Sequence, residues 1–371
     1  MIIHFSILLV IAIVSVIWES RIRSYAISVT QNNNVNLKAP IIPWTIFFGY
    51  LAFLAGMRTR INDSSAYRTS FQQLPATFDH IKEIWSGDGK DKGFDTIATV
   101  FKVLVSDNYH AWFLFFAIIE SILLIAVLRK YSVSLWDGCF FFFVSSLYFN
   151  YFSMMRQWMA VVILFYASKF IMEEKPVQYI ITCCLTAQLH SSAYLFIIVY
   201  FLVRGKAWSN KQNLILIAFS IGMVFFQPIL SIMDTTLSGT TYDYVIDTMQ
   251  SNSGSSIIRA FITIIPVIIS YIDRDKLEGK MINLCVNMSL ITFMLNLLAS
   301  FTSGLYVIRL SVYTEIFNVI LYPYLLNRTL SNQNRKIIKP VFYLLYLIYY
   351  VYQMNRTGSF YYGSDILGNF N

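Results

Sequence analysis

Charged residues are scarce in this sequence. Asp, Glu, Lys and Arg make up 13% of the 371 residues, whereas a soluble domain carries about 25%. Hydrophobic residues make up 57%, and the mean hydropathy is +0.57. This balance excludes a soluble globular domain and indicates an integral membrane protein. The formal charge of +8 is not gathered into a basic, aromatic-rich polar stretch, so nucleic-acid binding is not expected.

Cysteine motifs and the motifs of soluble enzymes are also lacking. Cys139, Cys183, Cys184 and Cys285 lie inside apolar runs and form no CxxC or Cys/His zinc spacing. There is no GxSxG, P-loop or HExxH, and no GxGxxG in a strand–helix setting. We therefore expect no metal and no cofactor. Met1 opens directly into an apolar run without a basic region or a cleavage site, which predicts an uncleaved first helix with its N-terminus outside.

Long apolar runs predict an all-α polytopic membrane protein, because only helices satisfy the backbone in runs this continuous. We expect a single integral membrane domain over residues 1–371 with about twelve transmembrane helices. Each connector assigned to the inside carries Lys or Arg, which predicts that both termini lie outside. The expected spans lie at about 2–18, a run that ends near 57, 109–128, 134–152, 157–172, 177–189, 193–203, 212–232, 257–272, 281–301, 309–327 and 340–354.

Two parts of this topology carry further expectations. Residues 58–108 form one long extracytoplasmic loop, in which the apolar residues from Phe94 to Val105 follow helical spacing. This pattern predicts an amphipathic helix on the membrane surface, or one packed on a small core within the loop. The runs at 177–189 and 193–203 are short, so a re-entrant pair around His190 is the alternative to two spans.

Arginines recur where spans meet the predicted outer face. Such ends should be poor in Arg and Lys, so each arginine needs a local reason. One reason is an anionic ligand, since a guanidinium binds phosphate oxygens in pairs, and this favours a lipid phosphate or pyrophosphate. The alternative is that these arginines extend to the lipid head groups and only anchor the span ends. The arginines concerned are Arg58, Arg60, Arg156, Arg259 and Arg309.

Other polar residues stand near these arginines in the sequence. Asp63 and Tyr67 follow Arg60 in the segment GMRTRINDSSAY, where Asp63 could orient an arginine, accept a proton or cap the next helix. Gln157 follows Arg156. His190, in QLHSSAY, could act as a general base, hold a phosphate or serve as a buried structural histidine.

The run at 309–327 contains a polar stripe. Its members Ser311, Glu315, Asn318 and Tyr322 follow one face of a continuous helix, while Arg309 and Tyr313 lie four residues apart on a neighbouring face. A carboxylate inside a membrane span is costly, so Glu315 should face a wet cavity or a partner. Glu120, near the middle of the run at 109–128, needs the same explanation.

With these residues laid out, the chain resembles the EpsG/Wzy-type polysaccharide polymerase family of bacterial exopolysaccharide gene clusters. The matching elements occur in the same order and at the same span ends as in the family, although Asn62 stands where relatives commonly have glycine. Asn tolerates the left-handed backbone conformation better than most residues. The elements are Gly56–Arg58 with Ile61–Asp63 and Tyr67, Lys92–Phe94, Arg156-Gln157 with Ala160, Leu189–Ala193, and Arg309 with Tyr313.

The resemblance implies a membrane glycosyltransferase that transfers a growing glycan from undecaprenyl pyrophosphate onto a second lipid-linked repeat unit outside the bacterial cytoplasmic membrane. Its partners would be these two lipid-linked oligosaccharides, membrane lipid, a chain-length regulator and a flippase. Asp63, His190 and Glu315, in that order, are the candidates for a general base. The expected catalytic residues are Arg58, Asp63, Arg156, His190 and Arg309, and the expected substrate-binding residues are Arg60, Tyr67, Gln157, Tyr313 and Glu315.

Two other classes of protein remain as alternatives. A lipid-linked oligosaccharide flippase would use the same arginines during translocation, but it needs polar residues at both faces, and here they gather at the outer face. A membrane O-acyltransferase needs an intramembrane histidine on the cytoplasmic side, and none of the four histidines suits that role.

Overall fold

The computed structural model describes residues 2–29, 41–225, 255–302, 304–357 and 361–368. Within these residues the protein is helical, and an isolated antiparallel bridge joins Arg60 and Gly363. The all-α prediction is therefore confirmed for the described chain. Its elements are α1 Ile2–Val29, α2 Ile41–Met57, α3 Ser64–Gln73, α4 Asp79–Ser86, α5 Lys92–Leu104, α6 Tyr109–Tyr131, α7 Leu135–Val144, α8 Leu147–Ser153, α9 Met155–Met172, α10 Pro176–Thr186, η1 Ser191–Leu195, α11 Phe196–Val203, α12 Asn210–Val224, α15 Ile257–Ile272, η2 Arg274–Lys276, α16 Lys280–Leu298, α17 Gly304–Glu315, α18 Asn318–Tyr324, η3 Leu325–Thr329 and α19 Asn332–Thr357.

Several helices begin at residues that satisfy their first free N–H groups. The Asn108 side chain accepts from the N–H of His110 at the start of α6, and Ser134 and Ser256 cap α7 and α15 in the same way. Pro176 occupies the first position of α10, where the missing N–H costs nothing. These caps fix the ends of apolar helices whose composition alone would not place them.

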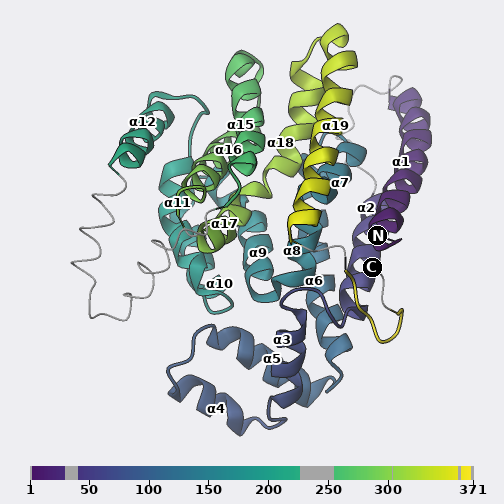
Figure 1. Ribbon diagram of the computed structural model, residues 1–371, viewed down its shortest axis with the longest axis vertical. Helices are drawn as coiled ribbons and strands as arrows, with labels where there is room; N and C mark the ends of the chain where they lie inside the picture. Colours follow the sequence, from purple (N-terminus) through teal and green to yellow (C-terminus); the bar gives the residue numbers. More distant parts are fainter. Residues whose placement is uncertain (1, 30–40, 226–254, 303, 358–360, 369–371) are drawn as a thin grey trace.

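One end of the molecule is formed by the segment predicted as a long loop (Figure 1). It contains α3, α4 and α5, and we call it the loop end. The bases of α6 and α9 and the turn before η1 also reach it, since α5 contacts α6 and the backbone N–H of Phe94 donates to Gln188 O at 3.2 Å.

The connectors predicted to be cytoplasmic meet one another away from the loop end. They comprise residues 129–130, 173–176, 204–211, 273–280 and 327–339. Lys280 donates to Met172 O at 3.0 Å, and Lys276 donates to Thr329 O at 2.7 Å. A cavity of about 490 Å³ is lined by Lys130, Glu173 and residues 278–282, so three of these connectors lie around one space. Alternating spans require connectors of one side to lie together, as these do.

By length and composition, three helices in the described residues could cross a membrane: α6, α16, and α19 over Asn332–Arg356. Shorter apolar helices lie at Ile2–Ile17, Ile41–Met57, Leu135–Val144, Pro176–Thr186, Ser191–Val203 and Ile257–Ile272. The count of twelve spans stays a prediction. The expected span at 212–232 is described only to residue 225. At about 1.5 Å per residue, α10 is roughly 17 Å long, which suits the re-entrant alternative around His190.

Two predicted spans are broken helices. The run at 134–152 divides into α7 and α8 at Ser146, whose φ of 63° lies in the left-handed region. The run at 309–327 divides into α17 and α18 at residues 316–317 and then widens into the π-turn η3. The predicted polar stripe through Ser311, Glu315, Asn318 and Tyr322 therefore runs over two helices instead of one, with an interruption between Glu315 and Asn318. Tyr322 still lies near both Asn318 and Glu315.

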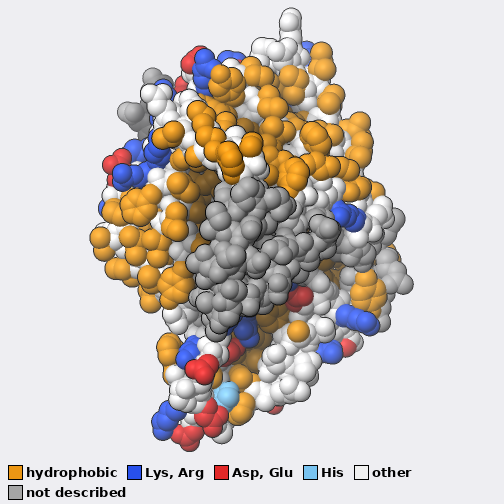
Figure 2. Space-filling model, turned by 60° about the vertical axis from the view of Figure 1, so that its left-hand side comes forward, with side chains coloured by type: hydrophobic (Ala, Val, Ile, Leu, Met, Phe, Trp, Pro, Cys, Tyr) orange, Lys and Arg blue, Asp and Glu red, His pale blue; other side chains and the backbone are white. Residues whose placement is uncertain are grey.

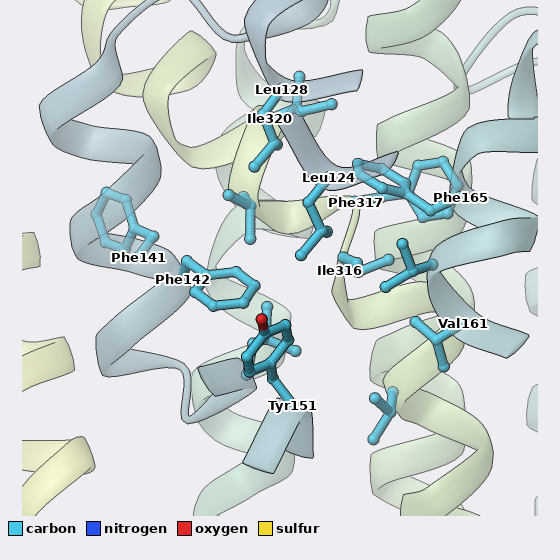
Figure 3. Close-up of a cluster of buried hydrophobic side chains, with 14 of the residues drawn as sticks. Leu124, Leu128, Phe141, Phe142, Tyr151, Val161, Phe165, Ile316, Phe317 and Ile320 are labelled. Atoms are coloured by element: carbon cyan, nitrogen blue, oxygen red, sulfur yellow. The ribbon is translucent and has the colours of Figure 1, made fainter. Parts of the chain in front are cut away.

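The second break lies in the hydrophobic core (Figure 3). Ile316 and Phe317 are buried, and the Phe317 ring packs edge-on against Phe165 of α9 with centroids 4.9 Å apart. The cluster in Figure 3 also draws on Leu124 of α6 and Phe142 of α7. Backbone hydrogen bonds continue through the break, since the Phe317 N–H donates to Thr314 O and the Val319 N–H donates to Ile316 O, each at 3.2 Å.

Figure 2 shows the surface expected of a membrane protein. Hydrophobic side chains cover much of the described upper part of this face, and acidic and basic side chains gather at its lower end. The exposed apolar residues include Ile122, Leu214, Ile268 and Leu344, which are between 48% and 65% exposed. Exposed apolar area of this extent requires lipid around it.

The predicted loop helix forms, as α5. Phe94, Ala98 and Phe101 are buried against α6 and α9 in a separate hydrophobic cluster, while Leu104 and Val105 are each 67% exposed. One apolar edge therefore packs on protein, while another is exposed. That the exposed edge lies on the membrane surface stays a prediction. Lys102 donates to the carbonyls of Phe71, Gln72 and Leu74 and so closes the C-terminal end of α3.

Candidate functional site

Arg309 and Asp63 come together at the loop end, although 246 residues separate them. Arg309 Nη2 lies 3.3 Å from Asp63 Oδ2, and each side chain is 38% exposed. An exposed ion pair contributes little to stability. The arrangement instead leaves guanidinium N–H donors beside a carboxylate at an accessible face.

Tyr67 links this pair to Arg156. It lies one helical turn after Asp63 on α3, and the Arg156 guanidinium carbon is 6.0 Å from its ring centroid. Burial raises the pKa of Tyr67, while Arg156 and Arg309 lower it and Asp63 raises it. The protonated hydroxyl therefore sits in the field of both arginines and can donate a hydrogen bond.

Arg156 is held by two carboxylates of the loop. Its Nη2 lies 2.9 Å from Asp95 Oδ1, its Nη1 lies 3.7 Å from Asp91 Oδ2, and its guanidinium stacks 4.6 Å from the Phe94 ring. Burial raises the pKa of Asp95, and the neighbouring Asp91 raises it further, against the opposing charge of Arg156. Arg156 is thus oriented and partly neutralised, a situation that the sequence reading did not foresee.

His190 shares Asp91 with Arg156. His190 Nδ1 lies 3.4 Å from Asp91 Oδ2, and the N–H of Ser191 donates to Asp91 Oδ1 at 2.9 Å. Burial opposes ionisation of Asp91, but His190, the Ser191 N–H and Arg156 outweigh it and lower its pKa. Neither Asp91 nor Asp95 was predicted to be a site residue, although the two flank the Lys92–Phe94 element.

Gly93 explains why that element contains a glycine. A Cβ on Gly93 would lie 2.7 Å from Gln188 Cβ and 2.9 Å from Gln188 O, closer than atoms tolerate. The missing side chain lets the start of α5 approach residue 188, two positions before His190. Asn62 has a φ of 44°, the left-handed conformation expected at this position.

Gln157 and Tyr313 fix α17 in place. Gln157 Nε2 donates to Arg309 O at 2.6 Å, and the buried Tyr313 shares a hydrogen bond with Ser192 at 2.9 Å. Both side chains point into packing between α9, α17 and η1. These contacts position α17, the helix that carries Arg309, and the predicted substrate contacts of Gln157 and Tyr313 stay a prediction.

The prediction that Arg58 binds an anion at the outer face is not supported by its surroundings. Arg58 is 2% exposed, its Nε donates to Ser64 Oγ at 3.0 Å, and its Nη1 donates to Ala55 O. Its guanidinium lies 4.3 Å from the Phe113 ring centroid. Arg58 therefore joins the end of α2 to the start of α3 by bonding the carbonyl of Ala55 and the hydroxyl of Ser64. The buried Glu120 also interacts with it electrostatically.

Glu315 also has an internal partner. Its Oε2 lies 2.7 Å from Nη2 of Arg259, and the two side chains are 5% and 16% exposed. This ion pair with Glu315 explains why an arginine stands at position 259, at the predicted outer end of a span. A carboxylate bonded in this way is not open to a glycan, contrary to the predicted substrate contact.

Arg60 lies apart from the Arg309 cluster, beside a C-terminal segment whose role the sequence reading missed. Arg60 is exposed, and its backbone N–H bonds Gly363 O at 3.3 Å. Asp365 bonds His110 Nε2 at 2.8 Å and the Tyr109 hydroxyl at 2.6 Å. Burial opposes ionisation of Asp365, but Tyr109 and His110 lower its pKa. Residues 361–368 thus form a strap over the loop end.

The arginine cluster and the first residues of the strap lie within a region matched by a known family. No curated protein and no solved structure matches the chain. The model of the EpsG family matches residues 41–363, which include α2, the loop end and the start of the strap. Since this match covers most of the 371 residues, the chain belongs to the EpsG family.

Proposed function

We propose that this chain is a polysaccharide polymerase, which transfers a glycan from undecaprenyl pyrophosphate onto a second lipid-linked repeat unit at the outer face of the bacterial cytoplasmic membrane. The observation that carries the proposal is the half-exposed pair of Arg309 and Asp63 at 3.3 Å. The reaction needs a hydrogen-bond donor that stabilises the leaving pyrophosphate and a base that accepts the proton of the attacking hydroxyl. This pair offers both at one place.

Arg309 acts on the leaving group. Negative charge grows on the pyrophosphate oxygen as its bond to the anomeric carbon breaks. A guanidinium already placed there stabilises the transition state more than the bound substrate. Gln157 and Tyr313 hold the helix that carries it, and the protonated Tyr67 hydroxyl supplies a second donor.

Asp63 is the first candidate for the base. The acceptor oxygen bonds to the anomeric carbon, its proton passes to the Asp63 carboxylate, and undecaprenyl pyrophosphate leaves. A weak base suffices because the sugar becomes oxocarbenium-like. His190 is the second candidate, and its tie to Asp91 orients it. Glu315 drops out of this role, because Arg259 occupies its carboxylate.

Arg156 orients the cluster in this proposal. Two carboxylates offset its charge, so its field at a ligand is weaker than that of Arg309. Its contacts with Phe94 and Tyr67 join α5 to α3 around the site. Arg58 has no contact with substrate here and maintains the fold between α2 and α3.

The test is analysis of lipid-linked products after deletion of the gene. A polymerase predicts loss of polymer with single repeat units accumulating on the outer face. Accumulation of the same units on the inner face would overturn the proposal and indicate a flippase. Polymer of normal length that lacks an acyl group would indicate an acyltransferase.

A further inference from the structure

A second cluster of anion-binding side chains lies at the loop end, beside the Arg309 cluster. A cavity of about 480 Å³ is lined by two arginines, two hydroxyl residues and a tyrosine: Thr59, Arg60, Ser65, Arg68 and Tyr361. No carboxylate and no aliphatic side chain is among these lining residues. The lining therefore suits a group with several negative oxygens.

Helix α3 separates this cavity from the Arg309 cluster. Asp63 and Tyr67 are four residues apart and share one side of the helix, facing Arg309 and Arg156. Arg68 follows Tyr67 and is turned by about 100° from it, and Ser65 lies three residues before Arg68 on that second side. A single short helix thus presents one polar face to each cluster.

The strap builds the far wall of the cavity and fixes its arginines. Gly363 O accepts from the N–H groups of Thr59 at 2.7 Å and Arg60 at 3.3 Å. The Arg60 guanidinium lies 5.9 Å from the Tyr361 ring centroid. The Arg68 guanidinium lies 5.8 Å from the ring centroid of Tyr109, whose hydroxyl bonds the strap through Asp365.

One hydrogen-bond donor of Arg68 has no partner in the cavity wall. Its Nε is buried and has no hydrogen-bond partner in the structure. The rest of this half-buried guanidinium interacts with the Tyr109 hydroxyl, but a buried N–H without a partner is costly, so a ligand oxygen near Nε would be favourable. An arginine that served only as a lipid anchor would extend its donors to the surface instead.

We propose that this cavity binds the pyrophosphate of the acceptor, the second lipid-linked oligosaccharide. The inference rests on the proposed function, in which the donor's pyrophosphate leaves at Arg309 while the acceptor keeps its own. The acceptor reacts through a sugar hydroxyl, so its pyrophosphate must be held away from the reacting bond. The two faces of α3 provide that separation.

The test counts binding sites on the purified full-length protein in nanodiscs of neutral lipid. Farnesyl pyrophosphate is the probe, and farnesol controls for the prenyl chain alone. Wild-type protein should bind two molecules. The double variant Arg60→Gln, Arg68→Gln should bind one, and Arg309→Gln should bind one at the other site. Each single substitution, Arg60→Gln or Arg68→Gln, should weaken its site roughly tenfold or more. Lys82→Gln on α4 removes one exposed charge of the same loop and should leave both sites intact.

Several outcomes would overturn the inference. Two sites in the double variant would exclude the cavity. So would one site in wild-type protein that is lost only with Arg309→Gln, and this result would leave the proposed function standing. Displacement of the probe from the Arg60–Arg68 site by phosphatidylglycerol in the nanodisc would assign the cavity to a phospholipid head group. Two pyrophosphate sites in a protein whose deletion leaves polymer intact would instead refute the polymerase proposal alone.

Discussion

Four arginines at the loop end occupy four different environments. Arg58 is buried on an aromatic ring, Arg156 is shared by two carboxylates, Arg309 has one half-exposed carboxylate, and Arg60 is exposed beside the strap. A guanidinium can stabilise developing charge only where its donors reach the ligand. Environment therefore assigns the roles that sequence position leaves equal.

Arg309→Lys should abolish most polymer formation at normal membrane abundance. Lysine keeps the charge but loses the planar pair of donors. Loss of one preorganised donor costs about 2.7–4 kcal/mol, or roughly a hundred- to thousandfold in rate. The measurement is polymer formed by purified protein from lipid-linked repeats. Arg204→Lys, an exposed arginine in the 204–211 connector, should match wild type. Near-normal polymer from Arg309→Lys would reduce Arg309 to an anchor.

Arg58→Met should lower stability before it affects chemistry. The substitution removes the hydrogen bonds that Arg58 donates to Ser64 Oγ and Ala55 O, and a buried polar group left without its partner costs about 1–3 kcal/mol. Thermal unfolding in detergent should show the loss. A stable Arg58→Met protein that makes no polymer would return Arg58 to the reacting site.

The Asp91 contacts should give the loop end an acid-sensitive step. The pKa of Asp91 in the fold is below its ordinary value of about 3.9. Its ionised contacts therefore stabilise the fold fully above that value and are lost as the pH falls through the lower, folded pKa. Unfolding temperatures measured from pH 7 to pH 3 should drop below about pH 4. Asp91→Asn should remove much of this step, whereas the exposed Asp88→Asn should not.

At the scale of elements, α5 has two apolar edges with different expected roles. Phe101 is 5% exposed within the cluster on α6, so Phe101→Glu should reduce protein abundance. Leu104 is 67% exposed, so Leu104→Glu should leave abundance unchanged and impair polymer formation where α5 meets lipid. Quantitative membrane immunoblots and polymer yield separate the two. Equal behaviour of both variants would contradict this division.

Helices were predictable from composition, but their interruptions were not. Hydropathy places α6 and α16 well, because each is a long apolar run. The break at Ser146 depends on a left-handed residue, and the break after Glu315 depends on packing of Phe317 against Phe165. The first break depends on the backbone conformation of a single serine and the second on a contact between residues distant in sequence, and hydrophobic periodicity reports neither.

At the scale of the whole molecule, the topology gives a direct prediction. The connectors with Lys and Arg lie together, and if they are cytoplasmic we expect the loop end to lie outside. An impermeant thiol reagent should label Asp88→Cys and Asn369→Cys in intact cells, but not Gln333→Cys. Asn369 lies outside the described residues. The native cysteines should be replaced first as the control, and labelling of Gln333→Cys alone would invert the orientation.

The sequence named most of the polar residues that the fold brings to the loop end, but not their partners. Arg156 and Arg309 were found because arginine is unexpected at the outer end of a span, and Asp63, Tyr67 and His190 were found because they stand near such ends. Asp91, Asp95, Arg68 and Asp365 lie in polar stretches where acidic and basic residues are ordinary. Only their contacts with distant elements distinguish them.

The two long-range ties at the loop end also bear on when the site forms. The contact of Asp63 with Arg309 spans 246 residues, and the contact of His110 with Asp365 spans 255 residues, so neither can form before the later residue has been synthesised. Chains fold during synthesis from the N-terminus. An incompletely synthesised chain therefore lacks both Arg309 beside Asp63 and the strap beside Arg60. Under the proposed function, we expect no glycan transfer until the C-terminal part of the chain has been made.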